Sequence, residues 1–280
     1  MRSNDYRALL KAGEDALTDA GLEDAPFDAR CLLEKSAGLD RTHLILSYGE
    51  RVPDDVRAAY TSAIARRAAG EPLQYILGAW DFCGHTFAVR AGVLIPRPET
   101  EFLVQKAASL LPPGGVLYDV CAGTGCIGLS VALRRPDTQV YLFEKYPSPF
   151  SCMQENICAH SAQNVHAVLC DMLQGAPDDV PAPDGIVSNP PYIRTSEMAS
   201  LQREVRREPR EALDGGEDGC VFYRALQALW FPLLREGGFM SMECGEGQPQ
   251  AVAALFGGAL IEPDYLGTAR FVTAFRNGKD

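Results

Sequence analysis

The amino-terminal part of the chain carries apolar side chains at helical spacing, interrupted by residues that end helices. Leu9 and Leu17 lie on one helical face, and Gly21 ends this first helix. Further helical patterns follow in "PFDARCLLEKSAG", "THLILSYG" and "DDVRAAYTSAIARRAAG", the last of which ends at Gly70. The segment "GEPLQYILG" that begins there is predicted to be extended. We therefore predict a small helical domain over residues 1–75.

A different pattern follows in "WDFCGHTFAV", which alternates aromatic and small residues about Gly84. Such alternation on both sides of a glycine is typical of a β-hairpin. We predict a hairpin linker over residues 76–92, which separates the helical domain from the rest of the chain.

From residue 98 onward, strand and helix patterns alternate along the chain. Strands are predicted in "VLYDV", "QVYLFE", "VHAVLCD", "GIVSN" and "GFMSMEC", and helices in "PETEFLVQKAASLL", "CIGLSVALR", "SPFSCMQENICAH" and "CVFYRALQALWFPLL". This alternation predicts an α/β domain over residues 93–280, with a parallel sheet covered on both faces. The last two strand patterns lack a helix between them and predict an antiparallel hairpin. Residues 193–218 form a long charged loop of the kind that is often functional.

The composition narrows the class of protein. A chain of 280 residues with 46% hydrophobic residues can bury a large core, and its net charge of -11 gives no general attraction for nucleic acid. The nine cysteines form no C-x-x-C pair and the four histidines lack zinc-ligand spacing, so we expect reduced thiols and no metal site. The start lacks an apolar signal segment, and no apolar run is long enough to span a bilayer. We expect a soluble cytoplasmic protein that binds no membrane.

A glycine-containing turn, "DVCAGTGCIGL", lies between a predicted strand and a predicted helix. Gly123 and Gly125 lack a Cβ and would let the backbone approach a ligand closely, while Gly128 would let the helix pack against the sheet. The Lys-Ser/Thr of a P-loop is missing from this turn. A phosphate cradle is therefore disfavoured, and a purely structural turn is the alternative to a ligand site.

Other strands end on residues that suit a nucleoside. Glu144 ends the second strand of the domain, about twenty residues after the glycines, where an acidic side chain accepts ribose hydroxyls; the alternative is a solvated strand end beside Lys145. Asp171 and Met172 close the third strand and could accept from, and pack against, an adenine, although a buried Met more often fills a core. Strand ends that share one sheet edge predict a nucleoside site there, and the fourth of them is Asn189.

The strand in "DGIVSNPPYIRT" stops at Asn189, directly before two prolines and Tyr192. Proline has no N–H for a ladder and holds the residue before it extended, so strand pairing ends here. An ordinary Asn-Pro turn without any chemistry is the simplest interpretation of this segment alone.

Taken together, "DVCAGTG", Glu144, "CDM" and "SNPPY" resemble the class I S-adenosylmethionine-dependent methyltransferases that methylate a planar nitrogen. The resemblance implies a Rossmann-like seven-stranded sheet and S-adenosyl-L-methionine as cofactor. A planar nitrogen is a poor nucleophile, because its lone pair is delocalised. The Asn189 side-chain oxygen and the Pro190 carbonyl would each accept one N–H of the substrate –NH2 and orient this lone pair, with Tyr192 against the flat group.

More of the sequence resembles one family of such enzymes. The segments "GEPLQYILG", "VLIPRPETEFLV", "SNPPYI", "EPREALDGGEDG" and "MECGEGQ" are similar, in this order, to those of the PrmC/HemK family. The resemblance covers nearly the whole chain. It implies methylation of the side-chain amide nitrogen (N5) of the glutamine in the Gly-Gly-Gln motif of peptide chain release factors. The motif "NPPY" by itself also allows a DNA adenine or RNA guanine amino group, which we keep as the alternative.

The resemblance also implies which residues form the site. Those that would bind the cofactor are Cys121, Ala122, Gly123, Thr124, Gly125, Glu144, Asp171, Met172 and Asn189, and those that would hold the substrate glutamine are Asn189, Pro190, Pro191 and Tyr192. The chain departs from the family pattern at four residues: Cys121-Ala122 stand in place of Gly-Thr, Glu144 in place of Asp, and Met172 in place of a bulkier or different residue. We expect Arg97 to reach the site, while Glu208-Pro209 either orders the long loop over the substrate or merely turns it.

Overall fold

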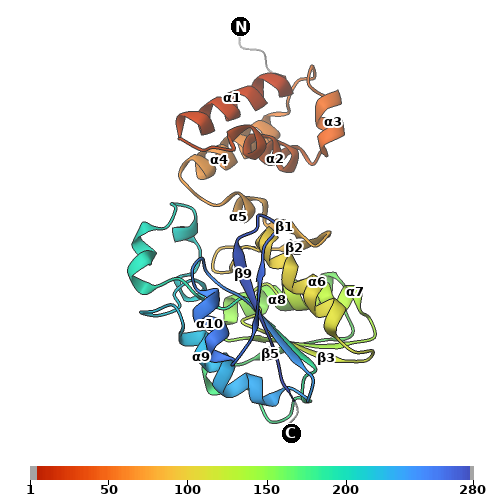
Figure 1. The fold of residues 1–280 in the computed structure, drawn as a ribbon. Helices are drawn as coiled ribbons and strands as arrows, with labels where there is room; N and C mark the ends of the chain where they lie inside the picture. Colours follow the sequence, from red (N-terminus) through yellow and green to blue (C-terminus); the bar gives the residue numbers. More distant parts are fainter. Residues whose placement is uncertain (1–4, 278–280) are drawn as a thin grey trace. The chain divides into compact units, whose positions relative to one another are not determined.

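The computed structural model describes residues 5–277, which divide into two compact units. The first unit comprises the chain up to Ala79 together with Gln202–Arg207, and the second comprises Trp80–Leu201 and the chain from Glu208 onward. Figure 1 shows that the first unit is helical and that the second is built around a twisted sheet. The domain boundaries predicted from the sequence, which are 1–75, 76–92 and 93–280, stay predictions.

The helices of the first unit enclose a small apolar core. They are α1 (Tyr6–Asp19), α2 (Ala25–Ala37), α3 (Arg41–Leu46), α4 (Asp54–Ala68) and α5 (Leu73–Leu77). Leu17, Leu33, Leu44 and Tyr60 are fully buried in this core. The helical patterns predicted for α1 to α4 are therefore confirmed.

The prediction of an extended segment after Gly70 is wrong where α5 forms. Pro72 stands at the N-cap of α5, and Gly78 ends the helix in the left-handed conformation with a φ of 73°. Because α5 is only five residues long, its apolar periodicity is too short to separate a helix from a strand in the sequence.

A buried cluster of charges attaches the segment Gln202–Arg207 to the helices of the first unit. The Arg67 side chain, only 7% exposed, pairs with Asp28 at 2.6 Å and with Glu204 at 2.7 Å. Part of the long charged loop predicted from the sequence thus belongs to the helical unit. Its Glu204 gives the buried Arg67 a second carboxylate partner beside Asp28.

The second unit contains the predicted seven-stranded sheet, in the order β5-β4-β3-β6-β7-β9-β8. Its strands are β3 (Val116–Val120), β4 (Gln139–Glu144), β5 (Val165–Leu169), β6 (Gly185–Ser188), β7 (Phe239–Glu243), β8 (Leu260–Pro263) and β9 (Ala269–Phe275). The strands from β3 to β7 pair in parallel, and β9 is antiparallel to both β7 and β8. The parallel sheet and the terminal hairpin predicted from the sequence are confirmed. The strand order reverses between β3 and β6, which is the point where open α/β sheets bind ligands at their carboxyl ends.

Helices cover both faces of this sheet. One face packs against α6 (Glu101–Leu110), α7 (Cys126–Arg134) and α8 (Pro147–Ala159), and the other against α9 (Val221–Ala225) and α10 (Pro249–Leu255). Along β3, Leu117 belongs to the first of these cores and Tyr118 to the second, as the alternation of a strand requires. A Cβ on Gly128 would lie 2.3 Å from the Leu142 side chain, so the predicted close packing of α7 on the sheet is confirmed.

Short elements complete the unit. The hairpin predicted about Gly84 is present as β1 (Ala79–Phe82) and β2 (His85–Ala88). The remaining elements are short 3₁₀ or π segments: η1 (Pro98–Thr100), η2 (Met172–Gln174), η3 (Thr195–Ser200), η4 (Val205–Arg207, in the first unit), η5 (Arg210–Ala212), η6 (Leu226–Trp230) and η7 (Phe231–Leu233).

The helix predicted in "CVFYRALQALWFPLL" is not uniform. It begins as α9, continues as the π-helical turn η6 and ends as the 3₁₀ turn η7. Pro232 lies in this last turn and has no N–H to continue a helical ladder. The helix α10 follows the segment Gly245-Glu246-Gly247-Gln248 and was not predicted from the sequence.

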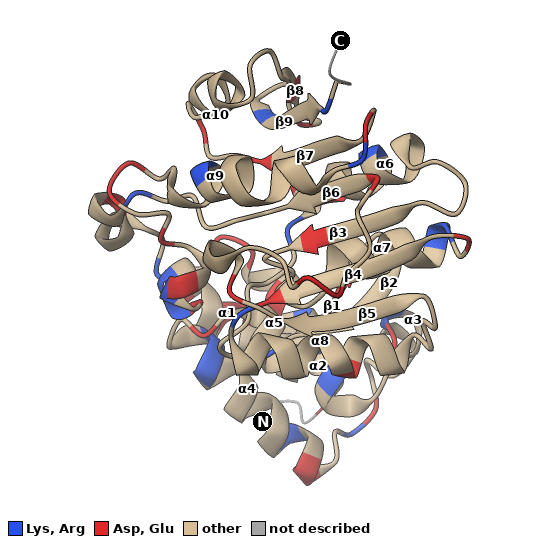
Figure 2. Ribbon diagram, turned by 90° about the horizontal axis from the view of Figure 1, so that it is seen from below, with Lys and Arg blue, Asp and Glu red and all other residues tan. Residues whose placement is uncertain are grey.

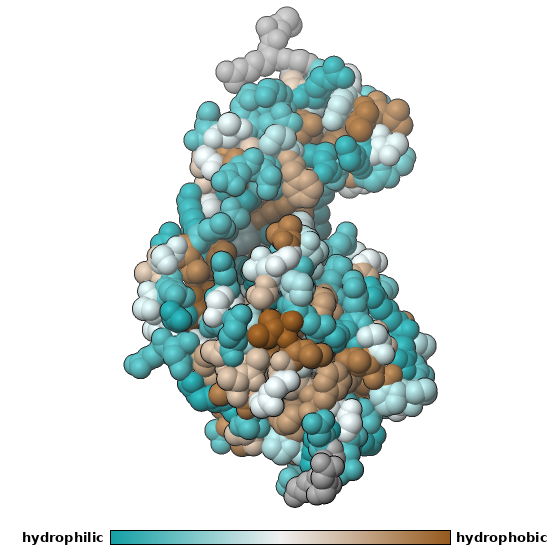
Figure 3. All heavy atoms as spheres, viewed as in Figure 1, coloured by the Kyte–Doolittle hydropathy of each residue, from teal (hydrophilic) through white to brown (hydrophobic). Residues whose placement is uncertain are grey.

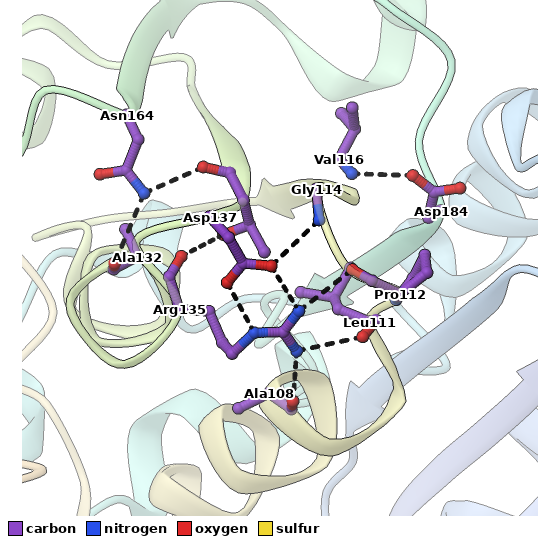
Figure 4. Close-up of polar contacts among 11 residues, drawn as sticks. Ala108, Leu111, Pro112, Gly114, Val116, Ala132, Arg135, Asp137, Asn164 and Asp184 are labelled. Atoms are coloured by element: carbon purple, nitrogen blue, oxygen red, sulfur yellow. Dashed lines mark hydrogen bonds and ion pairs between the residues drawn. The ribbon is translucent and has the colours of Figure 1, made fainter.

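Figure 4 shows how loops are fastened at the amino end of the central strands. Arg135 donates to the carbonyls of Ala108 and Leu111 at 2.9 and 3.0 Å, at the end of α6. It also forms a two-fold hydrogen bond with Asp137, which in turn accepts from the Gly114 N–H at 3.0 Å. These contacts satisfy backbone groups that the end of a helix leaves without partners.

The exposed surface is mixed in character. On the face seen in Figure 3, apolar residues gather near the middle of the sheet-containing unit and polar residues surround them. The hairpin formed by β8 and β9 contributes exposed apolar side chains, among them Leu260, Leu266 and Phe275. No helix within residues 5–277 is long and apolar enough to cross a membrane.

Candidate active site

The carboxyl ends of β3, β4, β5 and β6 border one cavity of the second unit. Figure 2 shows acidic residues, in red, at the ends of β3 and β7. Most of the predicted site residues line the cavity, namely Cys121, Ala122, Gly123, Thr124, Glu144, Asp171, Met172, Asn189 and Pro191. Within residues 5–277, the predicted residues that do not line it are Gly125, Pro190 and Tyr192. The structure thus brings the expected cofactor and substrate residues to one place.

The turn between β3 and α7 carries its backbone past the cavity in left-handed conformations. Cys121, Gly123 and Gly125 have φ angles of 65°, 57° and 79°. A Cβ on Gly123 would meet no atom within 4 Å, so this residue leaves open space, whereas a Cβ on Gly125 would lie 3.0 Å from the Leu142 and Met153 side chains. Gly123 therefore leaves room for a ligand, and Gly125 serves packing. Cys121 adopts a conformation that favours glycine and carries backbone strain.

Glu144 is held rigidly at the end of β4. Its carboxylate accepts hydrogen bonds from the backbone N–H groups of Gly123 at 3.0 Å and of Lys145 and Tyr146 at 2.8 Å each. Burial raises the pKa of Glu144, and the three N–H groups, which favour the charged form, limit this rise. A carboxylate has about four acceptor positions. One position therefore remains for a hydroxyl of a ligand.

Asp171 and Met172 follow β5 and form another part of the wall. Asp171 accepts from the Leu173 N–H at 3.0 Å and pairs with Lys145 at 2.9 Å. Burial acts to raise the pKa of Asp171, but Lys145 and this N–H lower it overall. The Met172 carbonyl accepts from the Trp230 indole at 2.8 Å, which fixes the backbone there. The pair thus offers a charged edge and an apolar side chain beside each other.

Asn189 is oriented by a chain of hydrogen bonds that reaches into the protein. Its Nδ2 donates to the Thr100 hydroxyl at 3.1 Å, and this hydroxyl donates to the Glu243 carboxylate at 2.6 Å. Thr100 and Glu243 are 2% and 1% exposed. Burial raises the pKa of Glu243 to about 7, although Thr100 opposes the shift. Within the described residues, the Asn189 side chain makes only this hydrogen bond, so its Oδ1 remains free to accept from a ligand.

Two of the residues after Asn189, Pro190 and Tyr192, do not line the cavity. Pro190 is buried, and the Tyr192 carbonyl accepts from the Gln248 side chain at 2.9 Å. Burial raises the pKa of Tyr192 to about 12, and the negative charge of Glu243 adds to this shift. Tyr192 therefore stays neutral and packs beside the apolar core, so it supports the strand end and does not line the cavity.

Two further segments contribute to the cavity wall. They are the chain from Gly92 to Arg97 and the end of the long loop, at Pro209, Glu211 and Ala212. Arg97 thus reaches the cavity, as expected from the sequence. It forms an ion pair with Glu208, which also accepts from the Ile95 N–H at 3.1 Å, so Glu208-Pro209 orders the end of the loop against this segment.

Thr100, which lines the cavity, and Glu243, which accepts from it, are among the residues that the sequence analysis missed. Both lie in segments that carry the family resemblance, but neither has an assigned role there. A signal was available for Glu243, because it is an acidic residue at the end of a buried strand, as Glu144 is. Thr100 gave no such signal, since its contacts depend on how the start of α6 meets the sheet.

Comparison with known proteins identifies the family. Residues 8–78 match the model of the PrmC N-terminal domain, and residues 98–231 match that of the methyltransferase small domain. A release factor glutamine methyltransferase from Geobacter sulfurreducens is 39% identical over 89% of this chain and 87% of its own length. The chain belongs to the release factor glutamine methyltransferase family. Another member, from Cereibacter sphaeroides, is 36% identical and covers 98% of both chains.

The fold of this family member is also that of solved methyltransferases. A crystal structure of a methyltransferase from Pyrococcus furiosus matches with a TM-score of 0.52 and 18% identity, over 69% of this chain and 89% of that one. The predicted class I methyltransferase fold, with a small helical region before it, is therefore confirmed.

Proposed function

We propose that this protein transfers a methyl group from S-adenosyl-L-methionine to the side-chain amide nitrogen of the glutamine in the Gly-Gly-Gln motif of peptide chain release factors. Membership of the release factor glutamine methyltransferase family supports the substrate. One observation of the structure carries the chemistry: Asn189 lines the cavity with its Nδ2 bound to Thr100, which leaves its oxygen to accept from a substrate –NH2.

The cavity fits S-adenosyl-L-methionine. Gly123 leaves space where any side chain would fill it, and Glu144 keeps an acceptor position for a ribose hydroxyl. Asp171 would accept from the adenine amino group, and Met172 would pack against the ring. When bound, this cofactor supplies an electrophilic methyl group on a sulfonium and leaves as S-adenosyl-L-homocysteine.

The residues of this chain would act on the glutamine amide by positioning it. The Asn189 oxygen and the Pro190 carbonyl would each accept one N–H, which turns the nitrogen lone pair out of conjugation and toward the methyl group. Because the amide proton becomes acidic only after the nitrogen is methylated, no strong base is required before the transfer. The neutral ring of Tyr192 supports the strand end that holds these acceptors.

A nucleic-acid amino group is the alternative substrate for such a site, and it is not favoured. The relatives that match over most of this chain are named for a release factor glutamine. A net charge of -11 also works against the phosphate contacts on which nucleic-acid binding depends.

We further propose that the helical domain binds the release factor, and that the protein acts in the cytoplasm, where release factors work. A separate helical unit is not needed for a nucleoside site whose lining residues all belong to the second unit. The segment Gln202–Arg207 belongs to the helical unit, and the chain continues from it directly to Pro209, which lines the cavity.

Labelled S-adenosyl-L-methionine tests the proposal. The purified chain is incubated with a release factor, with a variant in which the Gly-Gly-Gln glutamine is replaced, and with DNA. We expect one added methyl group on that glutamine by mass spectrometry and no label in the other two samples. If adenine in DNA is methylated and the release factor is not, the glutamine amide is excluded as the substrate. The proposed mechanism of methyl transfer to a planar nitrogen would still hold.

A further inference from the structure

We propose that Thr100 and Glu243 are positioning residues that decide which end of the Asn189 side-chain amide faces the substrate. Neither residue is required to touch the substrate or the cofactor for this role. The inference rests on the proposed function, because it concerns the acceptor that would hold the glutamine nitrogen. It also gives a role to Thr100, which lies in the segment "VLIPRPETEFLV".

The fold places the three residues together. Strands β6 and β7 are parallel neighbours whose last registered pair is Ser188 with Met242. Asn189 directly follows the last residue of β6, and Glu243 is the last residue of β7, so they lie next to this pair at the carboxyl ends of the two strands. Thr100, the last residue of η1, supplies the hydroxyl that joins them. The Tyr223 hydroxyl donates to the Glu243 carbonyl at 2.8 Å and fixes this strand end.

The direction of the hydrogen bonds carries the inference. An asparagine amide has an accepting oxygen and a donating nitrogen of nearly equal size, so shape does not decide how the group is turned. A threonine hydroxyl has one proton to donate. Since the Thr100 proton goes to the Glu243 carboxylate at 2.6 Å, the hydroxyl can only accept from Asn189, and it accepts from Nδ2. The oxygen is then the end that faces the cavity.

A turned amide would oppose the reaction. If Nδ2 faced the substrate, it would present N–H groups to the N–H groups of the glutamine, and one of the two acceptors in the proposed mechanism would be lost. The carboxylate of Glu243 is buried and accepts a hydrogen bond from the Thr100 hydroxyl. When ionised, Glu243 can only accept, and it then fixes the direction of both hydrogen bonds.

The test compares Thr100→Val with Thr100→Ser in the full chain, using the release factor and labelled S-adenosyl-L-methionine. Valine keeps the shape but cannot accept from Asn189, so we expect kcat to fall about tenfold, the effect of losing one hydrogen bond that aligns a reacting group. Serine keeps the hydroxyl and should hold kcat within about twofold. Cofactor affinity, measured by calorimetric titration, should change less than twofold in both variants.

Thr273→Val is the matched control. Thr273 is buried in β9 and donates to a carboxylate, that of Glu262, at 2.9 Å, but it does not line the cavity. This variant should lose stability and keep kcat, which separates a general effect of removing a buried threonine hydroxyl that donates to a glutamate from an effect on Asn189. If Thr100→Val does not fold, Thr100→Ala removes the same hydroxyl without adding a methyl group.

The outcomes are distinct. Equal kcat in the Val, Ala and Ser variants would overturn the positioning role, and so would a parallel loss of kcat and cofactor affinity, which would indicate a disturbed cavity. A fall of kcat in Thr100→Val that Thr100→Ser restores supports it. If the wild-type chain does not methylate the release factor at all, the proposed function fails, and the same comparison on whichever amino-group substrate is methylated still decides the role of Thr100.

Discussion

Arg97 and Glu208, 111 residues apart in the sequence, form an ion pair in which the carboxylate side chain is only 2% exposed. Glu208 also accepts from the Ile95 N–H at 3.1 Å, so one buried acid binds a side chain and a backbone group of the same segment. Because that segment and the residues after Glu208 both line the cavity, the pair fixes two parts of the wall relative to each other.

Replacing Glu208 by Ala should therefore destabilise the protein. The change leaves the Ile95 N–H without its acceptor and Arg97 without its charge partner, and we expect a loss of roughly 1–3 kcal/mol in the free energy of unfolding. Urea unfolding of the wild type and the variant measures it. Asp218→Ala, which breaks an exposed pair with Arg224, is the control and should cost less than about 1 kcal/mol. Equal effects of the two changes would contradict a structural role for the buried pair.

The sequence predicted the order of the elements because most are long enough to show a period. The helices α1 to α4, the five parallel strands and the final hairpin each repeat an apolar pattern. The helix α5 was missed because five residues are too few for a period, and α10 because glycines and a proline precede its short apolar face. These are cases where caps and packing, not periodicity, decide the local structure.

For the site, the sequence predicted residues that act from the end of a strand. Glu144, Asp171 and Asn189 can be placed together from strand order alone, since parallel strands end at one edge. The role of Thr100 and the pairing of Arg97 with Glu208 could not be predicted, because each depends on a contact between segments that are distant in the sequence. The resemblance to a family supplied the motif, but the hydrogen-bond partners come from the packing.

Replacing Glu144 by Ala should weaken cofactor binding. The change removes a charge-assisted acceptor of a ribose hydroxyl, worth roughly 1.5–3 kcal/mol, so affinity should fall about tenfold or more. Calorimetric titration with S-adenosyl-L-methionine measures the effect. Since Glu144 also accepts from the Gly123 N–H, urea unfolding of the same variant must show that it remains folded at the titration temperature. A folded variant with unchanged affinity would remove Glu144 from the site.

Replacing Asn189 by Ala should affect the chemical step most. The lost oxygen would have aligned the glutamine nitrogen, and by analogy with other preorganised contacts to a transition state we expect kcat to fall roughly 10²–10³-fold. Cofactor affinity should change much less. Single-turnover methylation of the release factor, with calorimetry on the same variant, separates the two effects. An equal loss in both would show that Asn189 serves the cofactor and not the transfer.

Asp119 should make stability depend on pH. Its side chain is fully buried, one carboxylate oxygen accepts from the Gly128 N–H at 2.9 Å and the other has no hydrogen-bond partner among the described residues. Burial raises the pKa of Asp119 from 3.8 to about 7. Between these values the folded state binds more protons than the unfolded state, so stability falls as pH rises. Relative to Asp119→Asn, the wild type should lose up to about 1.4 kcal/mol per pH unit over this window. Urea unfolding at several pH values measures the free energy of unfolding of both proteins. If this free energy depends on pH in the same way in both, Asp119 does not cause the pH dependence.

The rate of methyl transfer should depend on the ionisation of Glu243. Burial raises its pKa to about 7, against the hydrogen bond from Thr100. Above this pH the carboxylate can only accept, and the Thr100 proton is committed to it. Below it, a protonated Glu243 can donate to Thr100, whose own proton can then go to the Asn189 oxygen and let the amide turn. The charged and titratable groups around Glu243 are Arg97, Glu99, Tyr192, Tyr223, Cys244 and Arg270.

We therefore expect kcat to fall as pH decreases through about 7 and to level off above it. The neutral glutamine amide does not titrate in this range, and Tyr192, whose pKa burial raises to about 12, does not either. Glu243→Gln should give a lower kcat that is flat between about pH 6 and 8.5, because a glutamine side chain does not titrate there and can either donate to Thr100 or accept from it. An unchanged pH profile in this variant would assign the ionisation to another group and would separate Glu243 from the orientation of Asn189.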